Sequence, residues 1–145
     1  MTRDDRNLPR PPWHGRTAGT VEQTLGLEYE SLDKDHVVIA TDVTPRLFQP
    51  FGVVHGGVYV LMCESAASVA ASLSIDLARE LAMGMEINAN HLRPARAGRL
   101  RASARPIHRG RSTHVYHCEV HNDDALVCVS RCTVAIRPRP DGAAQ

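Results

Sequence analysis

The second half of the chain alternates between polar and apolar residues, a period of two that is typical of strands with one buried face. In residues 98–108, for example, Leu100, Ala102 and Ala104 share one face while arginines occupy much of the other. Two shorter stretches nearer the beginning also have the composition of strands. The pattern predicts six strands, at about residues 27–32, 36–43, 82–93, 98–108, 112–122 and 125–137.

A different periodicity separates the second predicted strand from the third. From Val58 to Leu77 apolar residues recur at intervals of three and four, which predicts a helix with a wide apolar face. Alanine and serine are frequent in this segment, so other parts of the backbone can approach it closely. Because Glu64 and Asp76 make the segment too polar to span a bilayer, we expect a buried helix.

Two strands, one long helix and four more strands predict an α+β fold, with an antiparallel sheet of about six strands around one central helix. A single helix leaves the other sheet face half covered, so we expect a homo-oligomer. The charged, proline-containing residues 1–18 predict a flexible N-terminal arm, which Trp13 could anchor. One domain is expected over residues 19–138, followed by a C-terminal tail over 139–145.

The composition is that of one soluble globular domain. The chain has 145 residues, a formal net charge of +1 and 43% hydrophobic residues. This balance gives no general attraction to nucleic acid or to an anionic membrane, and we expect neither as a partner. The four cysteines show no paired C-x-x-C spacing, and the first residues lack the apolar stretch of a secretion signal. The expected location is a reducing cytoplasm.

The segment His55-Gly56-Gly57 opens the predicted helix and is the first candidate for chemistry. Unblocked N–H groups at a helix start carry about half a positive charge and suit an oxyanion. Two glycines let a substrate carbonyl approach, and one well-aimed donor to a developing oxyanion lowers a barrier by about 3–4 kcal/mol. Two turns later Glu64 interrupts the apolar stripe, where an unpaired charge is costly unless the site is functional or hydrated.

Simpler interpretations of these residues stay open. A glycine pair often does no more than permit a tight turn from a loop into a helix. Glu64 alone could be a solvated residue or the partner of an arginine. A glutamate of ordinary pKa, about 4.3, is nevertheless ionised at pH 7 and needs no activating residue. We interpret His55 as a residue that orients the loop and the helix start rather than one that transfers protons.

These motifs together resemble those of a known family. Gln49 lies six positions before His55 and Glu64 lies nine after it, as in hotdog-fold acyl-CoA thioesterases of the 4-hydroxybenzoyl-CoA and phenylacetate-degradation type. The similarity extends over about residues 20–137. It includes the segments Asn88-Ala-Asn-His-Leu-Arg-Pro-Ala and His108-Arg-Gly-Arg, which are weak motifs alone.

The resemblance implies a hotdog fold and hydrolysis of an acyl-CoA thioester to free acid and CoA. It implies that the Gly56 N–H polarises the carbonyl, that Gln49 helps to hold the acyl or leaving group, and that Glu64 is nucleophile or general base. Ser68, four residues further along the same helical face, is implied to assist the carboxylate or the water. A second branch of the family takes a serine from the following strand; Gly84 aligns with that position, which favours the arrangement with Glu.

The spacing of these groups predicts active sites that are shared between subunits. Gly56 and Glu64 are eight residues apart, about 12 Å along a helix, whereas reacting atoms must approach to about 3 Å. We therefore expect a homodimer with shared sites, as the family also implies, in a dimer of dimers, a homotetramer. The groups expected to meet are Gln49, His55 and Gly56 of one subunit and Glu64 and Ser68 of the other.

Coenzyme A ends in a phosphorylated nucleotide, so basic residues after the helix are candidates for binding its phosphates. The candidate CoA-binding residues are Gly57, Arg93, Arg109, Arg111, Ser112 and Thr113. A solvated strand face and turn is an equally good interpretation of each arginine. CoA enters as part of the substrate, and we expect no separate cofactor.

The histidines do not predict a metal site. His117 and His121 share a strand face but stand about 13 Å apart, and His114 points to the other face. Cys128 and Cys132 also lack the spacing of a pair of metal ligands, so no metal is expected.

Two other functions stay open as alternatives. The fold alone does not fix a function, so a non-catalytic acyl-CoA-binding or regulatory hotdog module is the main one. Nucleic-acid binding through the arginine-rich strand is the other, but that strand lacks the interleaved aromatic residues that such binding uses. The acyl group cannot be read from the sequence, because pocket size depends on how side chains such as Phe48, Phe51, Tyr59, Met83 and Met85 pack.

Overall fold

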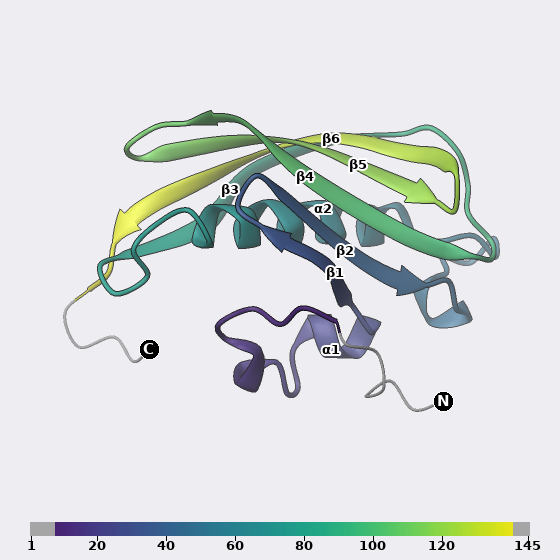
Figure 1. Cartoon of the computed structure of the whole chain (residues 1–145). Coiled ribbons are helices and arrows are strands. Elements are labelled where there is room, and N and C mark those ends of the chain that lie inside the picture. Colours follow the sequence, from purple (N-terminus) through teal and green to yellow (C-terminus); the bar gives the residue numbers. More distant parts are fainter. Residues whose placement is uncertain (1–7, 141–145) are drawn as a thin grey trace.

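Six antiparallel strands form one sheet that curves around a single long helix (Figure 1). The computed structural model describes residues 8–140, so residues 1–7 of the predicted arm and 141–145 of the predicted tail lie outside the described residues. The elements are η2 (His14–Arg16), α1 (Val21–Leu25), β1 (Glu28–Asp33), β2 (His36–Asp42), η3 (Pro45–Leu47), α2 (Gly56–Ser72), β3 (Glu80–His91), β4 (Arg99–Arg109), β5 (Thr113–Asn122) and β6 (Ala125–Pro138).

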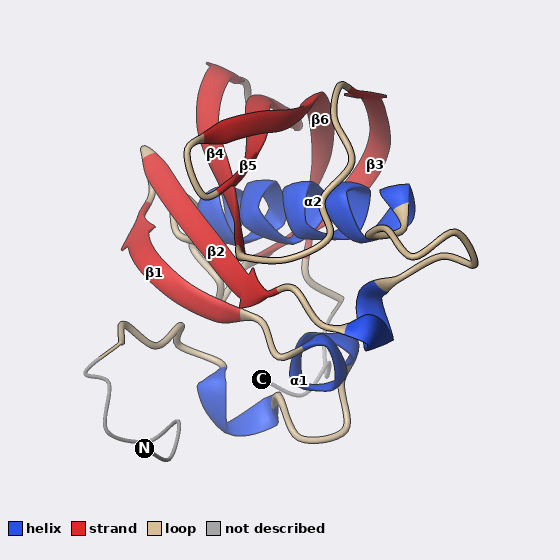
Figure 2. Cartoon of the chain, turned by 90° about the vertical axis from the view of Figure 1, so that its right-hand side faces the viewer, coloured by secondary structure: helices blue, strands red, loops and turns tan. Residues whose placement is uncertain are grey.

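The strand order explains how the helix becomes enclosed. It is β1-β2-β4-β5-β6-β3, with every neighbouring pair antiparallel. Figures 1 and 2 show α2 in the hollow of the curved sheet, with α1 on the side of α2 that faces away from β4, β5 and β6. This confirms the predicted α+β hotdog arrangement. The domain limits at residues 18 and 138 stay predictions.

The core lies between α2 and the inner face of the sheet. Along β4, Leu100, Ala102 and Ala104 are fully buried, as the alternation predicts. Helix α2 contributes alanines that are fully buried as well, Ala66 and Ala70 among them. Because alanine adds only a methyl group, the helix backbone lies close to the strands, and the small residues predicted to permit this approach do so.

Helix α2 is shorter than the apolar spacing predicted, and the predicted end near Leu77 is wrong. The helix ends at Ser72. The hydroxyl of Ser74 donates a hydrogen bond to the carbonyl of Ala71 at 2.8 Å, and the Ser74 N–H donates to the same carbonyl at 3.0 Å. A hydroxyl that satisfies the last carbonyls locally removes the need for another helical turn.

The described part of the predicted arm is packed rather than extended. Trp13 is half-buried against the hydrophobic core, and the next three residues form η2. Helix α1 follows: the Thr20 side chain accepts a hydrogen bond at its start, and Gly26 ends it with a φ of 65° in the left-handed region.

Part of the arginine-rich segment has a structural role. The Arg99 guanidinium is 15% exposed and donates to Glu28 at 2.7 Å, to Glu30 at 2.9 Å and to Asp42 at 2.8 Å. Arg101 also pairs with Glu30, at 2.8 Å. Burial alone would raise the pKa of Glu30, but the hydrogen bonds from the two arginines outweigh it and hold the pKa below its ordinary value. Arg99 therefore ties β1, β2 and β4 together.

Replacing Arg99 by Ala is expected to lower the free energy of unfolding by about 2–3 kcal/mol, because it removes the cation shared by half-buried carboxylates. Urea denaturation at pH 7 measures the change. Folding lowers the pKa of Glu30, so ionised Glu30 stabilises the folded protein. This contribution is fully present above the unfolded pKa near 4.5 and is lost as the pH falls through the folded pKa. The difference between wild type and variant should therefore shrink below about pH 4. Arg105→Ala, at an exposed position on the same strand, is the control and should cost less than about 0.5 kcal/mol.

Candidate active site

The start of α2 presents one backbone donor rather than the two expected. His55 is the N-cap residue, and its Nδ1 accepts a hydrogen bond from the Gly57 N–H at 2.9 Å. Nδ1 is therefore unprotonated, and in the neutral ring the proton is on Nε2. Within residues 8–140 the Gly56 N–H has no acceptor. His55 thus orients the helix start, as interpreted from the sequence, and Gly56 supplies the donor that can reach a ligand.

Gly56 lines a cavity of about 290 Å³ together with Gln49 and Tyr59. The loop before the helix holds Gln49 in place: its N–H donates to the carbonyl of Val53 at 2.8 Å, and its side-chain oxygen accepts the N–H of Phe51. The amide NH₂ of Gln49 is then the group that remains to donate to a ligand. The predicted pair of Gln49 and Gly56 is therefore brought together in one subunit.

His91 is a residue of this cavity that the sequence analysis missed as a site residue. It is the last residue of β3, and its imidazole covers Gly56 so closely that a Cβ there would lie 2.7 Å from Nε2. The ring also contacts the ring of Tyr59, with centroids 5.7 Å apart. The contact joins residues far apart in the sequence, so only the period-two pattern of β3, which turns His91 inward, could have hinted at it.

Glu64 lies in a second cavity, of about 330 Å³, further along α2. Its other lining residues include Ser68 and Ser72, the next residues along the same helical face, and Trp13 from the N-terminal arm. Ser68 thus shares a cavity with Glu64, as its spacing of four residues predicts. Trp13 is another residue of the site that the sequence did not assign, because nothing local links the arm to α2.

The absence of a side chain at Gly84 makes room for the Glu64 carboxyl group. A Cβ at Gly84 would lie 2.9 Å from Cδ and 3.1 Å from Cγ of Glu64, and closer still to Oε1. Gly84 is the residue before a bulge at Met85, where β3 shifts its register against β6. The alignment of Gly84 with a serine position in another branch of the family therefore has a physical counterpart: a larger residue there would displace this glutamate.

The two cavities are separate within one subunit. They have no lining residue in common. Gly56 lies against the His91 end of β3, whereas Glu64 lies against its Gly84 end. One chain therefore carries two half-sites, a donor half with Gln49 and Gly56 and a carboxylate half with Glu64 and Ser68.

The predicted CoA-binding arginines lie in different surroundings. Arg93 lines the donor half-site and donates to the carbonyl of Leu126 at 2.7 Å. Arg109 is engaged elsewhere: it pairs with Asp35 at 2.6 Å and donates to the carbonyl of Lys34, in the turn between β1 and β2. Arg109 therefore anchors a turn in this structure.

The other predicted CoA-binding residues, Arg111, Ser112 and Thr113, lie where β4 turns into β5. The carbonyl of Ser112 accepts the N–H of Ile136 near the end of β6, whereas Arg93 lies beside the first residues of β6. At the rise of a strand these positions are about 30 Å apart. One subunit does not bring the predicted set together, because the residues are neighbours in sequence but at opposite ends of the sheet.

No cysteine is suited to act as a nucleophile. Cys63, Cys118, Cys128 and Cys132 are all free and buried. Burial raises the pKa of Cys128 to about 11 and that of Cys132 to about 12, so both are thiols at neutral pH. Across residues 8–140, no group of three or more His, Cys, Asp or Glu side chains is placed to hold a metal ion. None of the helices in the same range is long and apolar enough to cross a membrane.

Comparisons with known proteins agree with this architecture. Residues 51–129 match the family model described as the thioesterase superfamily. The chain is 42% identical over 120 residues to a 1,4-dihydroxy-2-naphthoyl-CoA hydrolase of Listeria monocytogenes, which covers 82% of this chain and 97% of that protein. It is 38% identical over 119 residues to a hydrolase of the same name from Escherichia coli, covering 81% of this chain and 87% of the relative.

Solved structures give the same result. A mutant thioesterase from Pseudomonas aeruginosa superimposes with a TM-score of 0.82 at 36% identity, covering 86% of this chain and 91% of that one. A thioesterase from Haemophilus influenzae also reaches 0.82, at 34% identity, with 90% and 91% of the two chains covered. The hotdog fold expected from the sequence is therefore the fold of thioesterases of known structure.

Replacing Gly84 by Ala is expected to displace the Glu64 carboxylate and to lower kcat on a CoA thioester by about 10- to 100-fold, because catalysis is sensitive to misplacement by about 1 Å. KM should change much less, since the substrate contacts other residues. Adding Glu64→Asp to Gly84→Ala should restore part of kcat, because the shorter side chain leaves room for the new methyl group. If adding Glu64→Asp to Gly84→Ala lowers kcat further, Gly84 does not position the carboxylate.

Proposed function

Because the chain belongs to the thioesterase superfamily, we propose that it hydrolyses acyl-CoA thioesters at active sites that two subunits build together. Thioester hydrolysis follows from the family and its named relatives. The roles of individual residues and the assembly are our proposal. The observation that carries it is the separation of the donor half-site from the carboxylate half-site at the two ends of β3.

Strand β3 offers the edge along which a dimer can form. It is twelve residues long and, within the described part of the chain, pairs with β6 alone. Met83 and Met85 on this strand are 50% and 56% exposed. A long edge with unpaired N–H and C=O groups and exposed apolar side chains is a template for another strand. The opposite edge, β1, has six residues and a bulge, which makes it a poorer template.

Contacts between β3 and α2 support one register for this dimer. Gly84 marks the place of Glu64 along β3, and His91 marks the place of Gly56. Antiparallel pairing that sets Gly84 opposite the partner's His91 brings the carboxylate of one subunit to the helix start of the other. Twofold symmetry repeats the contact, so the dimer has two equivalent sites.

The bulge supports a twofold axis at Asn88 in the proposed dimer. Met85 is the extra residue of the bulge, so the midpoint between Gly84 and His91 falls at Asn88, opposite its own copy. With this count, the inward residues Ile87 and Ala89 of the two strands face each other on the same side of the sheet. The register is thus compatible with one continuous sheet covering both helices. The dimer of dimers stays a prediction.

In this assembly the thioester lies between the half-sites. The Gly56 N–H of one subunit donates to the carbonyl oxygen, and Gln49 helps to hold the acyl or leaving group, so charge that develops on the oxygen is stabilised. Glu64 of the other subunit accepts a proton from the attacking water or attacks the carbonyl carbon itself, with Ser68 assisting. When Glu64 acts as the base, water adds to the carbonyl carbon and the C–S bond breaks to give the acid. When Glu64 attacks, the C–S bond breaks to leave an anhydride between Glu64 and the acyl group, which water then hydrolyses to the acid. In both cases the sulfur of CoA takes up a proton.

Subunit complementation tests whether the sites are shared. Glu64→Ala and Gly56→Pro should each lose at least about 100-fold in kcat. Proline suits the backbone at Gly56, the first helical residue, because His55 has an extended ψ of 130°. Its Cβ also meets the His91 imidazole, so the change removes the N–H and displaces His91, and both effects fall on the donor half-site. Mixed dimers of the two variants contain one intact site, and random mixing should restore about a quarter of wild-type activity.

The matched control mixes Glu64→Ala with Ser68→Ala. Both residues belong to the carboxylate half-site, so each site of a mixed dimer carries one change, and activity should not exceed that of the Ser68→Ala sites in the mixture. Equal recovery in the two mixtures, or recovery in neither, would contradict the shared site. Absence of thiol release by the wild-type protein from a broad acyl-CoA panel, including 1,4-dihydroxy-2-naphthoyl-CoA, would favour the non-catalytic module instead.

Cross-linking tests the register directly. Asn88→Cys should form a disulfide between subunits under mild oxidation, because facing residues of antiparallel strands have Cα atoms about 4.5–5.5 Å apart. Asn90→Cys is the control on the same exposed face, and its two copies would stand about 13 Å apart. The native cysteines are all buried, so a dimer band on a non-reducing gel reports the new thiol. Cross-linking through Asn90→Cys alone would rule out the register.

A further inference from the structure

The carboxylate half-site does not end at Ser72. A neighbouring cavity of about 490 Å³ shares two lining residues with it, Trp13 and Ser72. The two cavities therefore adjoin at these residues, and a path between them would run along α2, from Glu64 toward the end of the helix, beneath the N-terminal arm. Glu64 and Ser72 are separated by about 12 Å at the rise of a helix, which sets the approximate length of the path.

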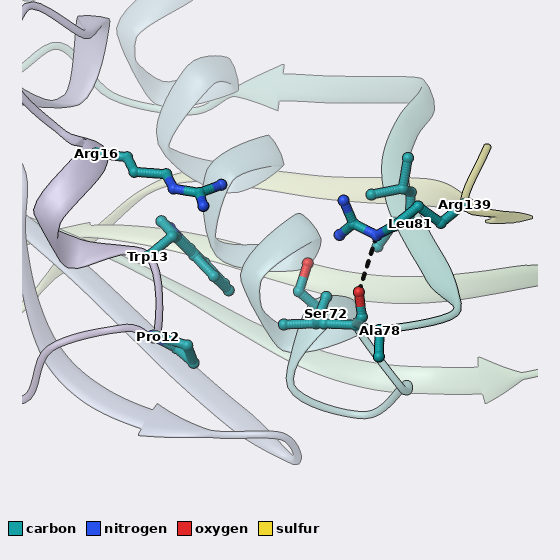
Figure 3. Close-up of a pocket in the computed structure, with 9 residues that line it drawn as sticks. Pro12, Trp13, Arg16, Ser72, Ala78, Leu81 and Arg139 are labelled. Carbon is teal, nitrogen blue, oxygen red and sulfur yellow. Dashed lines mark hydrogen bonds between the residues drawn. The ribbon is translucent and has the colours of Figure 1, made fainter. Parts of the chain in front are cut away.

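This far cavity combines apolar walls with two cations. Its walls are largely apolar and include Trp13, Leu77 and Leu81. Figure 3 shows the guanidinium groups of Arg16 and Arg139 reaching toward each other across it. The Nε of Arg139 donates to the carbonyl of Leu77 at 3.0 Å, which fixes that side chain at the cavity wall. Arg16 has no carboxylate partner within the described residues, so its charge is available to a ligand.

Charge changes sign along the path. Glu64 and Glu22 both line the near cavity, and Glu22 accepts a hydrogen bond from the Tyr29 hydroxyl at 3.0 Å. Arg16 and Arg139 line the far one. A ligand with a negative group is repelled near the two carboxylates and attracted near Arg16, so the field favours one orientation of such a ligand.

We propose that the far cavity binds the distal end of the acyl group and selects acyl groups that end in a carboxylate or another anion. The proposal rests on acyl-CoA hydrolysis at Glu64 and deepens it by naming a substrate class. With the thioester at Glu64, an acyl chain of about eight carbons reaches the far cavity. Its methylene groups pack on Trp13 and the leucines while its terminal anion meets the guanidinium of Arg16.

Matched pairs of CoA thioesters test the selection for charge. Suberoyl-CoA and octanoyl-CoA have the same number of carbons and differ in the terminal carboxylate. Wild-type protein should prefer suberoyl-CoA by about tenfold in kcat/KM, and Arg16→Gln should reduce this ratio at least about threefold, the size expected for a partly solvated ion pair. The shorter pair, succinyl-CoA and butyryl-CoA, should show no such preference, because the carboxylate does not reach Arg16.

Arg79→Gln is the control for a general effect of charge. Arg79 lies in the turn after α2, its side chain is 86% exposed, and it does not line the cavity. Its replacement should leave the ratio of suberoyl-CoA to octanoyl-CoA unchanged. The proposal is overturned by a wild-type protein without preference for the carboxylate, or by equal changes of the ratio in the Arg16 and Arg79 variants.

Fluorescence of Trp13 gives a test that does not depend on turnover. Trp13 is the single tryptophan of the chain and lines both cavities. In the Glu64→Ala variant, suberoyl-CoA should change its emission at lower concentration than octanoyl-CoA does, and free CoA should change it least. An equal response to free CoA would assign the cavity to the CoA nucleotide and overturn the proposal. If no thioester is hydrolysed but the selective response is seen, acyl-CoA hydrolysis fails while the binding preference stands.

Discussion

The structure depends on how closely β3 can approach α2, and two glycines set that distance. At one end of the strand the imidazole of His91 occupies the space that a side chain at Gly56 would need; at the other end the carboxyl group of Glu64 occupies the space at Gly84. Each contact is possible because one partner has no side chain. The same strand therefore contacts both candidate groups, Gly56 through His91 and Glu64 beside Gly84, and they lie apart in the chain that carries them.

This separation is the reason why we propose that a second subunit completes the site. A backbone donor at the start of a helix and a carboxylate two turns later point to different cavities, and no rotamer of Glu64 closes a gap of about 12 Å. In the proposed dimer a twofold axis exchanges the two ends of β3 and so brings the two groups together. The bulge at Met85 fits this proposal, since omitting Met85 from the count puts the midpoint between Gly84 and His91 at Asn88 and keeps the inward residues on one side.

Local patterns in the sequence were sufficient for the fold. Alternation along β4 and β5 reflects a sheet with one buried face, and the observed strand ends differ from the predicted ones by two residues or fewer. The end of α2 could not be predicted in the same way, because it depends on a single hydroxyl at Ser74 that competes for the helix carbonyls. Periodicity reports which side of a segment is buried but not which polar group ends it.

The candidate site was predictable only where its residues are neighbours in sequence. His55, Gly56 and Glu64 lie on one loop and helix, so their spacing carries geometric information. His91 and Trp13 reach the same cavities from a distant strand and from the N-terminal arm, and no local pattern contains those contacts. Identification of such residues requires the tertiary structure.

The arginines show most clearly what the sequence alone cannot predict. Their clustering in the sequence suggested a single site for the phosphates of CoA. In the fold Arg99 is enclosed by three carboxylates and Arg109 holds a turn. Arg16, outside the cluster, faces a cavity that also holds a tryptophan. A guanidinium that already has carboxylate partners gains little from an anionic ligand, whereas one beside an apolar wall, with only solvent to compete, can select one. The surroundings of each arginine, more than the number of arginines, therefore decide where a negative charge on the substrate will lie.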